Sequence, residues 1–398
     1  MKNYFLINLM SIVALLTGTV VADSFFSSAA LGLPHYVVSA PAIGMGGAGI
    51  GVRQYLTLNE MNPAAVDLKG MSMVTAGLQA EAITHTIGDA STATRQANAA
   101  GFRLAVPIKS QFAVMFAFKP RTATRYTVDS ETFIGDDKMT RTLDGKGGLN
   151  AVSLGGHYVI VKGVVFGAMF DYYFGTFQEL WKTDFDNPDF LDTRENASSN
   201  FYGKGVQVGL FLQPWKALSF GAVFSSSSRL NAETSVVTGG GKSLEPVKQK
   251  ADYPAGVGLG TAVTLNKFLI TADLYQQWWT NFKIDGVVST KTADYFRAGV
   301  GAEYCDAKDD LADYLRRISY RLGGYYARLP FVDGSGEQAS ELIATLGLGF
   351  PFKKNAGRID LALEVGERSA GSAYPYSEKI LRFSAYVTGA ERWFIRNY

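Results

Sequence analysis

Apolar and polar residues alternate in fourteen stretches between about residues 71 and 389, separated by connectors that are alternately short and long. Successive side chains of a β-strand point to opposite faces, so a strand between hydrocarbon and water must alternate in this way. Unpaired backbone groups are costly in hydrocarbon, so a sheet inside a membrane has to close on itself. The pattern therefore predicts an all-β fold, a 14-stranded antiparallel transmembrane β-barrel of the bacterial outer membrane.

The hairpins show which residues would face lipid. In the clearest one, the apolar residues before and after a turn at Ser110–Gln111 share a face: Phe102, Leu104, Val106, Ile108, Phe112, Val114, Phe116 and Phe118. Similar hairpins are predicted over residues 152–174, 206–224 and 257–274. Long polar connectors are predicted at about 84–99, 121–148, 182–201, 227–250, 280–293, 327–340 and 368–379. An even number of strands places both ends of the chain on the periplasmic side. The connectors on that side are expected to be short except for residues 304–314, which have room for a short helix.

The composition suits a barrel wall and argues against several other functions. The chain has 43 glycines, 13% aromatic residues and only 19% charged residues, as expected for tight turns and aromatic girdles at the membrane interfaces. A net charge of +2 gives no support for nucleic-acid binding. The histidines His35, His85 and His157 show no paired spacing with each other or with Cys305. We therefore expect no metal, no cofactor and no catalytic activity.

The first 22 residues have the pattern of a secretory signal peptide. Lys2 supplies the positive charge, Tyr4–Leu16 supplies an apolar core, and Val20–Ala22 places small residues before the expected cut. The alternative, an uncleaved anchor helix, is disfavoured by the polar run Thr17–Thr19. Because Cys305 is the single cysteine, neither a lipoprotein anchor near residue 22 nor an intrachain disulfide is expected.

Residues 23–70 do not alternate like the wall, which is expected to occupy residues 71–398. Small residues run from Ala40 to Gly51, and an Asn62-Pro63-Ala64 turn follows. Because small side chains can pack closely in a narrow lumen, we expect this segment to form a hatch, or plug, inside the barrel.

Two glycine patterns could instead indicate a nucleotide site. Gly44, Gly46 and Gly49 match a dinucleotide-binding pattern, but that motif requires a preceding strand and a βαβ unit. Here Pro41 precedes the glycines and β-hairpins follow. Gly239–Ser243 looks like a phosphate loop, but Val236 stands where its first glycine is required. We interpret neither pattern as a nucleotide site.

Several segments resemble the FadL-type family of outer-membrane transporters. They are Gly44–Gly49 with Asn62–Ala65, similar to the family's hatch and its Asn-Pro-Ala motif, and further along Val106–Pro120, Tyr253–Gly260, Asp273–Tyr275 with Trp279, Arg321–Pro330 and Leu346–Phe350. The resemblance covers most of the mature chain. It implies a channel for passive uptake of hydrophobic small molecules such as long-chain fatty acids.

The resemblance also implies a route for the ligand. The ligand lands among the outer loops, passes to a site near the start of the hatch, and leaves sideways through a gap in the wall. Lateral exit keeps an apolar chain out of water, which is worth roughly 0.8 kcal/mol per CH₂. In the family the gap comes from an inward kink of the third strand, beside the Asn-Pro-Ala motif. The third strand lies here near Phe112–Pro120 and contains no glycine for such a kink, so the chain departs from the family at this point.

Three groups of residues are candidates for the site. The hatch candidates are Asn62, Pro63, Ala64, Gly44, Gly46 and Gly49, and Phe25 and Phe26 near the new N-terminus could contact an apolar ligand. The lumen-charge candidates are Arg103, Lys109 and Lys119, which alternation turns away from lipid.

Two other functions are compatible with a plugged barrel pattern. One is a partner or shuttle in an outer-membrane protein export or assembly machine, with the tail Gly389–Phe394 as a possible contact. The other is a generic porin, against which the expected plug argues. The expected partners are a hydrophobic small molecule and outer-membrane lipid, and the expected state is a monomer.

Overall fold

A computed structural model describes residues 24–36, 39–134, 137–289, 292–309, 311–352, 356–371 and 376–393, so the expected signal peptide lies outside the described residues. The wall strands in chain order are β2 (Ser72–Ile87), β3 (Ala90–Lys109), β4 (Phe112–Pro120) continued by β5 (Thr122–Ile134), β6 (Asp137–Val161), β7 (Val164–Phe185), β8 (Thr193–Trp215), β9 (Leu218–Ser225) continued by β10 (Ser228–Val237), β11 (Val247–Tyr253) continued by β12 (Gly256–Leu265), β13 (Phe268–Gln277), β16 (Tyr295–Cys305), β17 (Ser319–Val332), β18 (Gln338–Phe352), β19 (Gly357–Ala370) and β20 (Tyr376–Glu391). The short elements are η1 (Phe25–Ser28), β1 (Leu33–Pro34), α2 (Ala40–Ile43), η2 (Trp279–Asn281), β14 (Lys283–Ile284), β15 (Val287–Val288) and η3 (Tyr314–Arg317).

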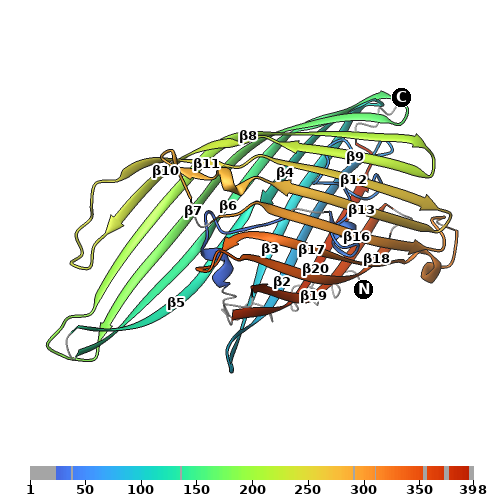
Figure 1. The fold of residues 1–398 in the computed structure, drawn as a ribbon. Helices are drawn as coiled ribbons and strands as arrows, with labels where there is room; N and C mark the ends of the chain where they lie inside the picture. Colours follow the sequence, from blue (N-terminus) through green and yellow to red (C-terminus); the bar gives the residue numbers. More distant parts are fainter. Residues whose placement is uncertain are drawn as a thin grey trace, which may run out of the picture.

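The fourteen wall strands form a closed antiparallel cylinder (Figure 1). The first strand pairs with the last along its whole length, from Ser72 opposite Glu391 to Ile87 opposite Tyr376. This pairing removes the free edge that an open sheet would expose to lipid. The predicted fold class and strand number are confirmed.

The outer and inner faces of the wall differ in the way that a membrane requires. Large apolar side chains are exposed on the outer face of successive strands, among them Val74, Leu78, Phe102, Phe116, Leu154, Phe166, Phe170, Leu210, Phe220, Phe224, Leu259, Leu274, Val300, Leu322, Leu346, Val365, Leu381 and Val387. Buried charged residues instead gather on the lumen side, including Lys119, Asp171, Glu303, Arg321, Asp360 and Arg368. A soluble protein would not expose so continuous an apolar surface, and a transmembrane barrel does. In the described residues, no helix has the length and apolarity to cross a bilayer.

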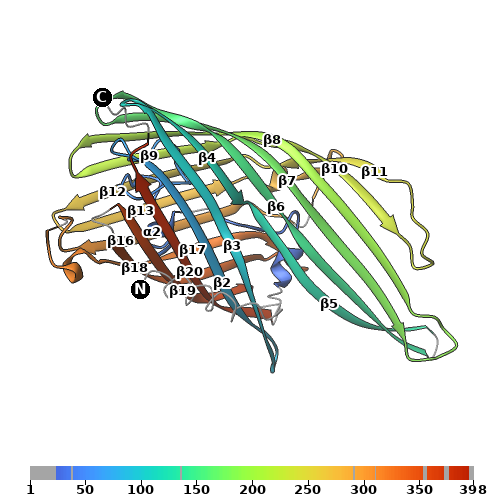
Figure 2. The same ribbon diagram turned by 180° about the vertical axis from the view of Figure 1, so that it is seen from behind.

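Several segments predicted as long connectors are strands. The extensions of β5, β6, β7, β8, β10 and β11 form a sheet, here called the outer sheet, that projects past the rest of the barrel (Figure 2). On β7 the outer face carries exposed Phe166 and Phe170 in the apolar belt, but Gln178 and Lys182 farther along. Beyond the belt both faces meet water, so the alternation that marks a membrane strand ends although the strand continues.

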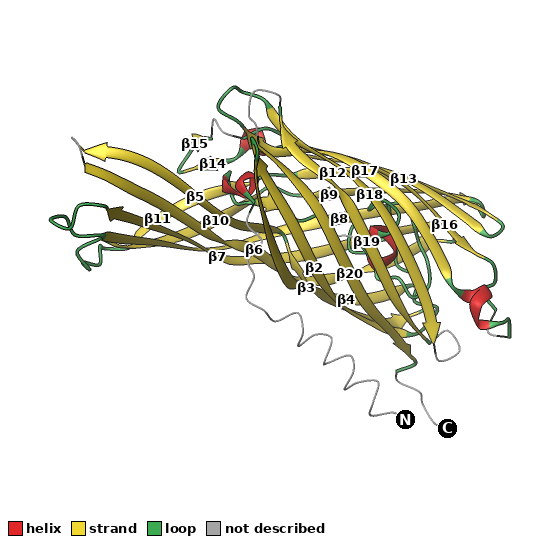
Figure 3. Cartoon of the chain, turned by 90° about the horizontal axis from the view of Figure 1, so that it is seen from below, coloured by secondary structure: helices red, strands yellow, loops and turns green. Residues whose placement is uncertain are grey.

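A short helix was expected in a connector at residues 304–314, but the connector extends to Ile318 and its helix begins only at Tyr314. This is the 3₁₀ helix η3, which projects from the end of the barrel opposite the outer sheet (Figure 3). Asp306 of this connector binds Arg316 and also Lys267, which lies in the turn between β12 and β13. The two hydrogen-bonded cations hold the pKa of the Asp306 carboxyl down at about 2.

Candidate functional site

Residues 24–70, here called the N-terminal segment, are mostly buried and bind lumen-facing residues of the wall. The Gly46 amide donates to Thr345 Oγ1 on β18 at 2.9 Å. The Gly49 and Ile50 amides donate to Asp273 Oδ2 on β13 at 2.6 and 2.8 Å. Buried backbone donors need such partners, so these wall side chains fix where the segment lies in the lumen.

The Asn62-Pro63-Ala64 turn is anchored by the Asn62 side chain. Its amide nitrogen donates to the carbonyl oxygens of Ile50 and Leu210, both at 3.0 Å, and its oxygen accepts the Ala64 amide at 3.0 Å. Asn62 is fully buried, so all of these partners matter energetically. The turn is therefore joined both to the rest of the segment and to β8.

Wall glycines let the segment approach the wall backbone to backbone. A Cβ added at any of them would clash with the segment; we call this set the glycine belt, and it consists of Gly167, Gly209, Gly221, Gly260, Gly299, Gly301, Gly323 and Gly347. The belt runs over β7, β8, β9, β12, β16, β17 and β18. It explains why a chain with a lumen-filling segment needs glycine inside strands, where glycine is otherwise unfavourable.

The wall ladder is interrupted between β3 and β5, at what we call the β3–β5 gap. Residues 90–101 of β3 pair with β2 and, within the described part of the chain, with no strand on their other side. β5 pairs with β6, and at Thr122 and Ala123 it pairs with β1 of the N-terminal segment. The third strand lacks a kink glycine, as its sequence showed. Two irregularities border the gap. Gly101 of the second strand has a φ of +112° next to a register shift against β2, and the third strand is interrupted between Pro120 of β4 and Thr122 of β5.

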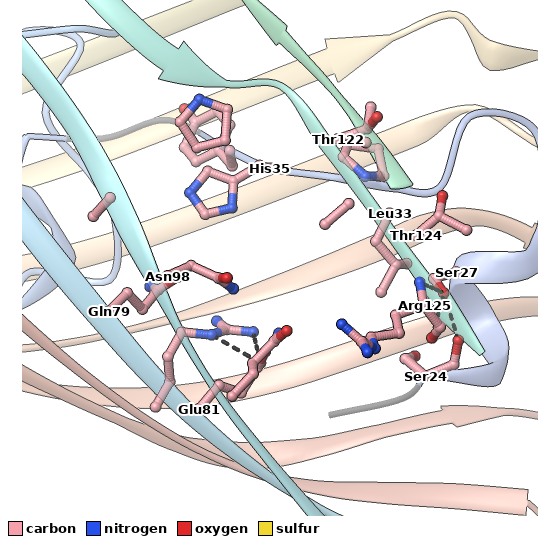
Figure 4. Close-up of a pocket in the computed structure, with 18 of the residues that line it drawn as sticks. Ser24, Ser27, Leu33, His35, Gln79, Glu81, Asn98, Thr122, Thr124 and Arg125 are labelled. Carbon is pink, nitrogen blue, oxygen red and sulfur yellow. Dashed lines mark hydrogen bonds and ion pairs between the residues drawn. The ribbon is translucent and has the colours of Figure 1, made fainter. Parts of the chain in front are cut away.

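A cavity of about 730 Å³ connects the lumen with this gap. Figure 4 shows Gln79, Glu81 and Asn98 on one side of it, Thr122, Thr124, Arg125, Ser24 and Ser27 on the other, and His35 between them. Arg297, Tyr325 and Tyr386 line it deeper in the lumen. Burial, followed by the charge of Arg382, lowers the pKa of His35 to about 4, so His35 is neutral at neutral pH.

The cavity wall is rich in paired charges. Arg382 binds Glu81 at 2.6 Å and Glu364 at 3.4 Å. Arg368 binds Glu341 at 2.8 Å and Glu378 at 2.7 Å. The lining also has apolar members such as Leu33, Ile43 and Phe118. The cavity thus offers polar groups beside apolar surface, which suits binding of a small molecule. In the described ranges, no group of three or more His, Cys, Asp or Glu is placed to hold a metal ion.

The three lumen-charge candidates have different places. Arg103 is buried, forms an ion pair with Glu60 of the N-terminal segment and lines the cavity. Lys119 is buried and binds Gln207 at 3.0 Å and Asp171 at 3.4 Å. Lys109 is exposed at the last position of β3, away from the cavity lining.

The two phenylalanine candidates lie in an aromatic cluster. Phe25 has its ring 5.4 Å from that of Phe331 and 5.6 Å from that of Tyr376, and Phe26 lies 5.2 Å from both. Phe26 is almost completely buried. This packing holds η1 against the wall next to Ser24, whose hydroxyl donates to Glu378 at 2.8 Å.

Some residues of the site were missed by sequence reasoning. Asp273 is the single charged residue of β13, and alternation places it on the lumen face, so its position could have indicated a contact inside the barrel. Arg368 and Arg382 form ion pairs with carboxylates on other strands. Because strand pairing brings these partners together, no local sequence pattern predicts the pairs.

Three comparisons place the chain among known proteins. A crystal structure of a Pseudomonas aeruginosa FadL homologue is similar over 90% of this chain and 99% of that one, with a TM-score of 0.66 and 12% identity. The Ralstonia pickettii toluene transporter TbuX covers 88% of this chain and 98% of its own, with a TM-score of 0.61 and 15% identity. The similarity to the P. putida toluene transporter TodX covers 91% of this chain and 100% of that one, with a TM-score of 0.58 and 16% identity. These likenesses confirm the FadL-type barrel fold.

Sequence comparison gives the family. No curated protein sequence matches the chain significantly. A family model described as BamG matches residues 1–398, the whole chain. The apolar outer belt and the closed barrel place the protein in the bacterial outer membrane. The chain therefore belongs to the BamG family.

Proposed function

We propose that this protein is an outer-membrane channel for passive uptake of hydrophobic small molecules such as long-chain fatty acids. In this proposal the N-terminal segment acts as the hatch, and the ligand passes between lumen and membrane through the β3–β5 gap. The observation that carries the proposal is the cavity of about 730 Å³ that joins the lumen to an interruption of the wall ladder.

Further features support this route over passage along the barrel axis. The glycine belt and the bonds to Asp273 and Thr345 keep the N-terminal segment across the lumen. An apolar chain that moves sideways also avoids water, which favours exit into the membrane by roughly 0.8 kcal/mol per CH₂. The paired charges of the cavity suit a ligand that carries a polar head group.

Narrowing the gap tests the proposal. Asn98 lines the cavity at the gap, whereas its neighbour Ala97 lies outside the lining. We expect Asn98→Trp to reduce uptake of radiolabelled oleate by cells that lack another fatty-acid channel, because the larger side chain obstructs the route. Ala97→Trp, made on the same strand, serves as the control and should transport normally. Equal uptake by both variants, each present in the membrane at the wild-type level, would refute the route.

A second candidate function is a barrel partner or shuttle in an outer-membrane export or assembly machine. The outer sheet favours it, because this sheet leaves the membrane and exposes large apolar residues such as Trp181, which is 45% exposed. Under this function, Trp181→Ser would weaken association with a partner and leave oleate uptake unchanged.

A further inference from the structure

The edge of β5 is only partly used within the described chain. β5 pairs with β6 from Thr124 to Ile134. On its other side, β1 pairs with Thr122 and Ala123, and the Ser24 amide donates to the Arg125 carbonyl oxygen at 2.7 Å. Beyond these contacts, no described strand pairs with Asp129 or Glu131 on this side. The β2–β3 and β5–β6 hairpins also diverge toward their tips (Figure 2).

The backbone direction at this edge follows from Arg125. Its carbonyl accepts from Ser24 and its amide donates to Ser27 Oγ at 2.9 Å, so both groups point away from β6. Alternate residues of an antiparallel strand direct their backbone groups to the same side. Asp129 and Glu131 therefore present amides and carbonyls to the open side, and such an edge is a template for strand addition.

The edge already accepts extended backbone. Ser24 to Pro34 of the chain itself occupies its beginning, and the remaining edge continues directly from that interface. The side chains of β5 then define which residues a further strand at this edge should carry. Tyr126 faces the lumen side, where its hydroxyl donates to Glu179 at 3.1 Å, and Val128 shares that side. The opposite side carries the carboxylates of Asp129 and Glu131.

We propose that the free edge of β5 binds an extended polypeptide segment of another protein, which adds to the outer sheet as a further strand. Cross-strand pairing requires apolar residues beside Tyr126 and Val128 and favours basic or hydroxyl residues beside Asp129 and Glu131. The partner segment therefore alternates apolar with basic or hydroxyl residues. This interaction is separate from the transport route and does not depend on it.

The test uses two synthetic peptides and the full-length protein in detergent. One octapeptide alternates Val with Lys or Thr, and the other has the same residues in apolar and polar blocks. We expect the alternating peptide to bind more tightly, as measured by fluorescence anisotropy of a labelled peptide. Asp129→Pro/Glu131→Pro should weaken its binding roughly thirty-fold, which corresponds to two backbone hydrogen bonds at about 1 kcal/mol each. Proline is tolerated where the lost amide points away from the sheet.

A matched variant separates backbone pairing from charge. Asp129→Ala/Glu131→Ala keeps both amides and removes both carboxylates, so it should retain most of the affinity. Resistance of the folded barrel to heat in detergent confirms that each variant is folded. The proposal is overturned if both peptides bind equally, if neither binds, or if the proline and alanine variants lose affinity to the same extent.

Discussion

Gly221 of β9 lies against the backbone carbonyl of Ile50 in the N-terminal segment. The carbonyl oxygen leaves no room for a methyl group on Gly221. We expect Gly221→Ala to displace the N-terminal segment at this point and to cost about 1–3 kcal/mol, the usual penalty of overpacking. The barrel ladder itself should remain. Hydrogen exchange would then be faster at residues 45–52 and unchanged in β17–β19.

The control for this substitution is a glycine outside the glycine belt. An added Cβ at Gly240 meets no atom within 4 Å, so Gly240→Ala should leave exchange unchanged. If Gly221→Ala also leaves residues 45–52 protected, then the segment does not depend on close approach to the wall.

Individual residues differ in how far the sequence could predict them. The importance of Asn62 was predicted from the Asn-Pro-Ala turn, although its bonds to Ile50 and Leu210 needed the fold. Alternation turned Arg103, Lys109 and Lys119 away from lipid; Lys109 is exposed at the end of β3, whereas Arg103 and Lys119 are buried. Their partners Glu60 and Asp171 were not predicted, because those residues are brought together only by closure of the barrel.

At the scale of strands, buried ion pairs connect different strands of the wall. Arg321 on β17 binds Glu303 on β16 and Asp360 on β19, both at 2.7 Å. Without the arginine, Asp360 keeps Arg358 as a partner, but buried Glu303 is left with a neutral hydrogen bond from Gln54. Breaking a buried ion pair typically costs about 3–5 kcal/mol. Arg321→Met should therefore lower the temperature at which the folded barrel unfolds on a denaturing gel.

A surface pair provides the comparison. Arg229 and Asp252 also form an ion pair across strands, at 3.2 Å, but both side chains are exposed. Such pairs contribute about 0–1 kcal/mol, so Arg229→Met should leave the unfolding temperature nearly unchanged. Equal shifts in the two variants would show that the lumen pair contributes no more than a surface pair.

The strands themselves were predictable only within the membrane. Alternation located the hairpin of β3 and β4 because one face meets lipid along Phe102–Phe118. It missed residues 122–148, where β5 and β6 pair but polar residues occur on both faces of the strands. A gap beside the third strand was implied by the family resemblance, but its place between residues 90–101 of β3 and β5 follows only from the strand pairing.

For the whole molecule, we propose a barrel that the N-terminal segment closes along its axis and that is open at its side. The glycine belt, Asp273 and Asn62 place the N-terminal segment across the lumen, and the cavity leads to the β3–β5 gap. In its proposed role as a hatch, the segment would block the continuous water path that a porin of similar strand number has, so the barrel should not conduct ions steadily.

Electrical recording of the purified protein in a planar lipid bilayer tests this claim most directly. The account predicts insertion without a steady ohmic current, while a porin recorded in the same bilayer conducts. A stable, voltage-independent conductance from the intact wild-type chain would show that the lumen is open along its axis and would contradict the account.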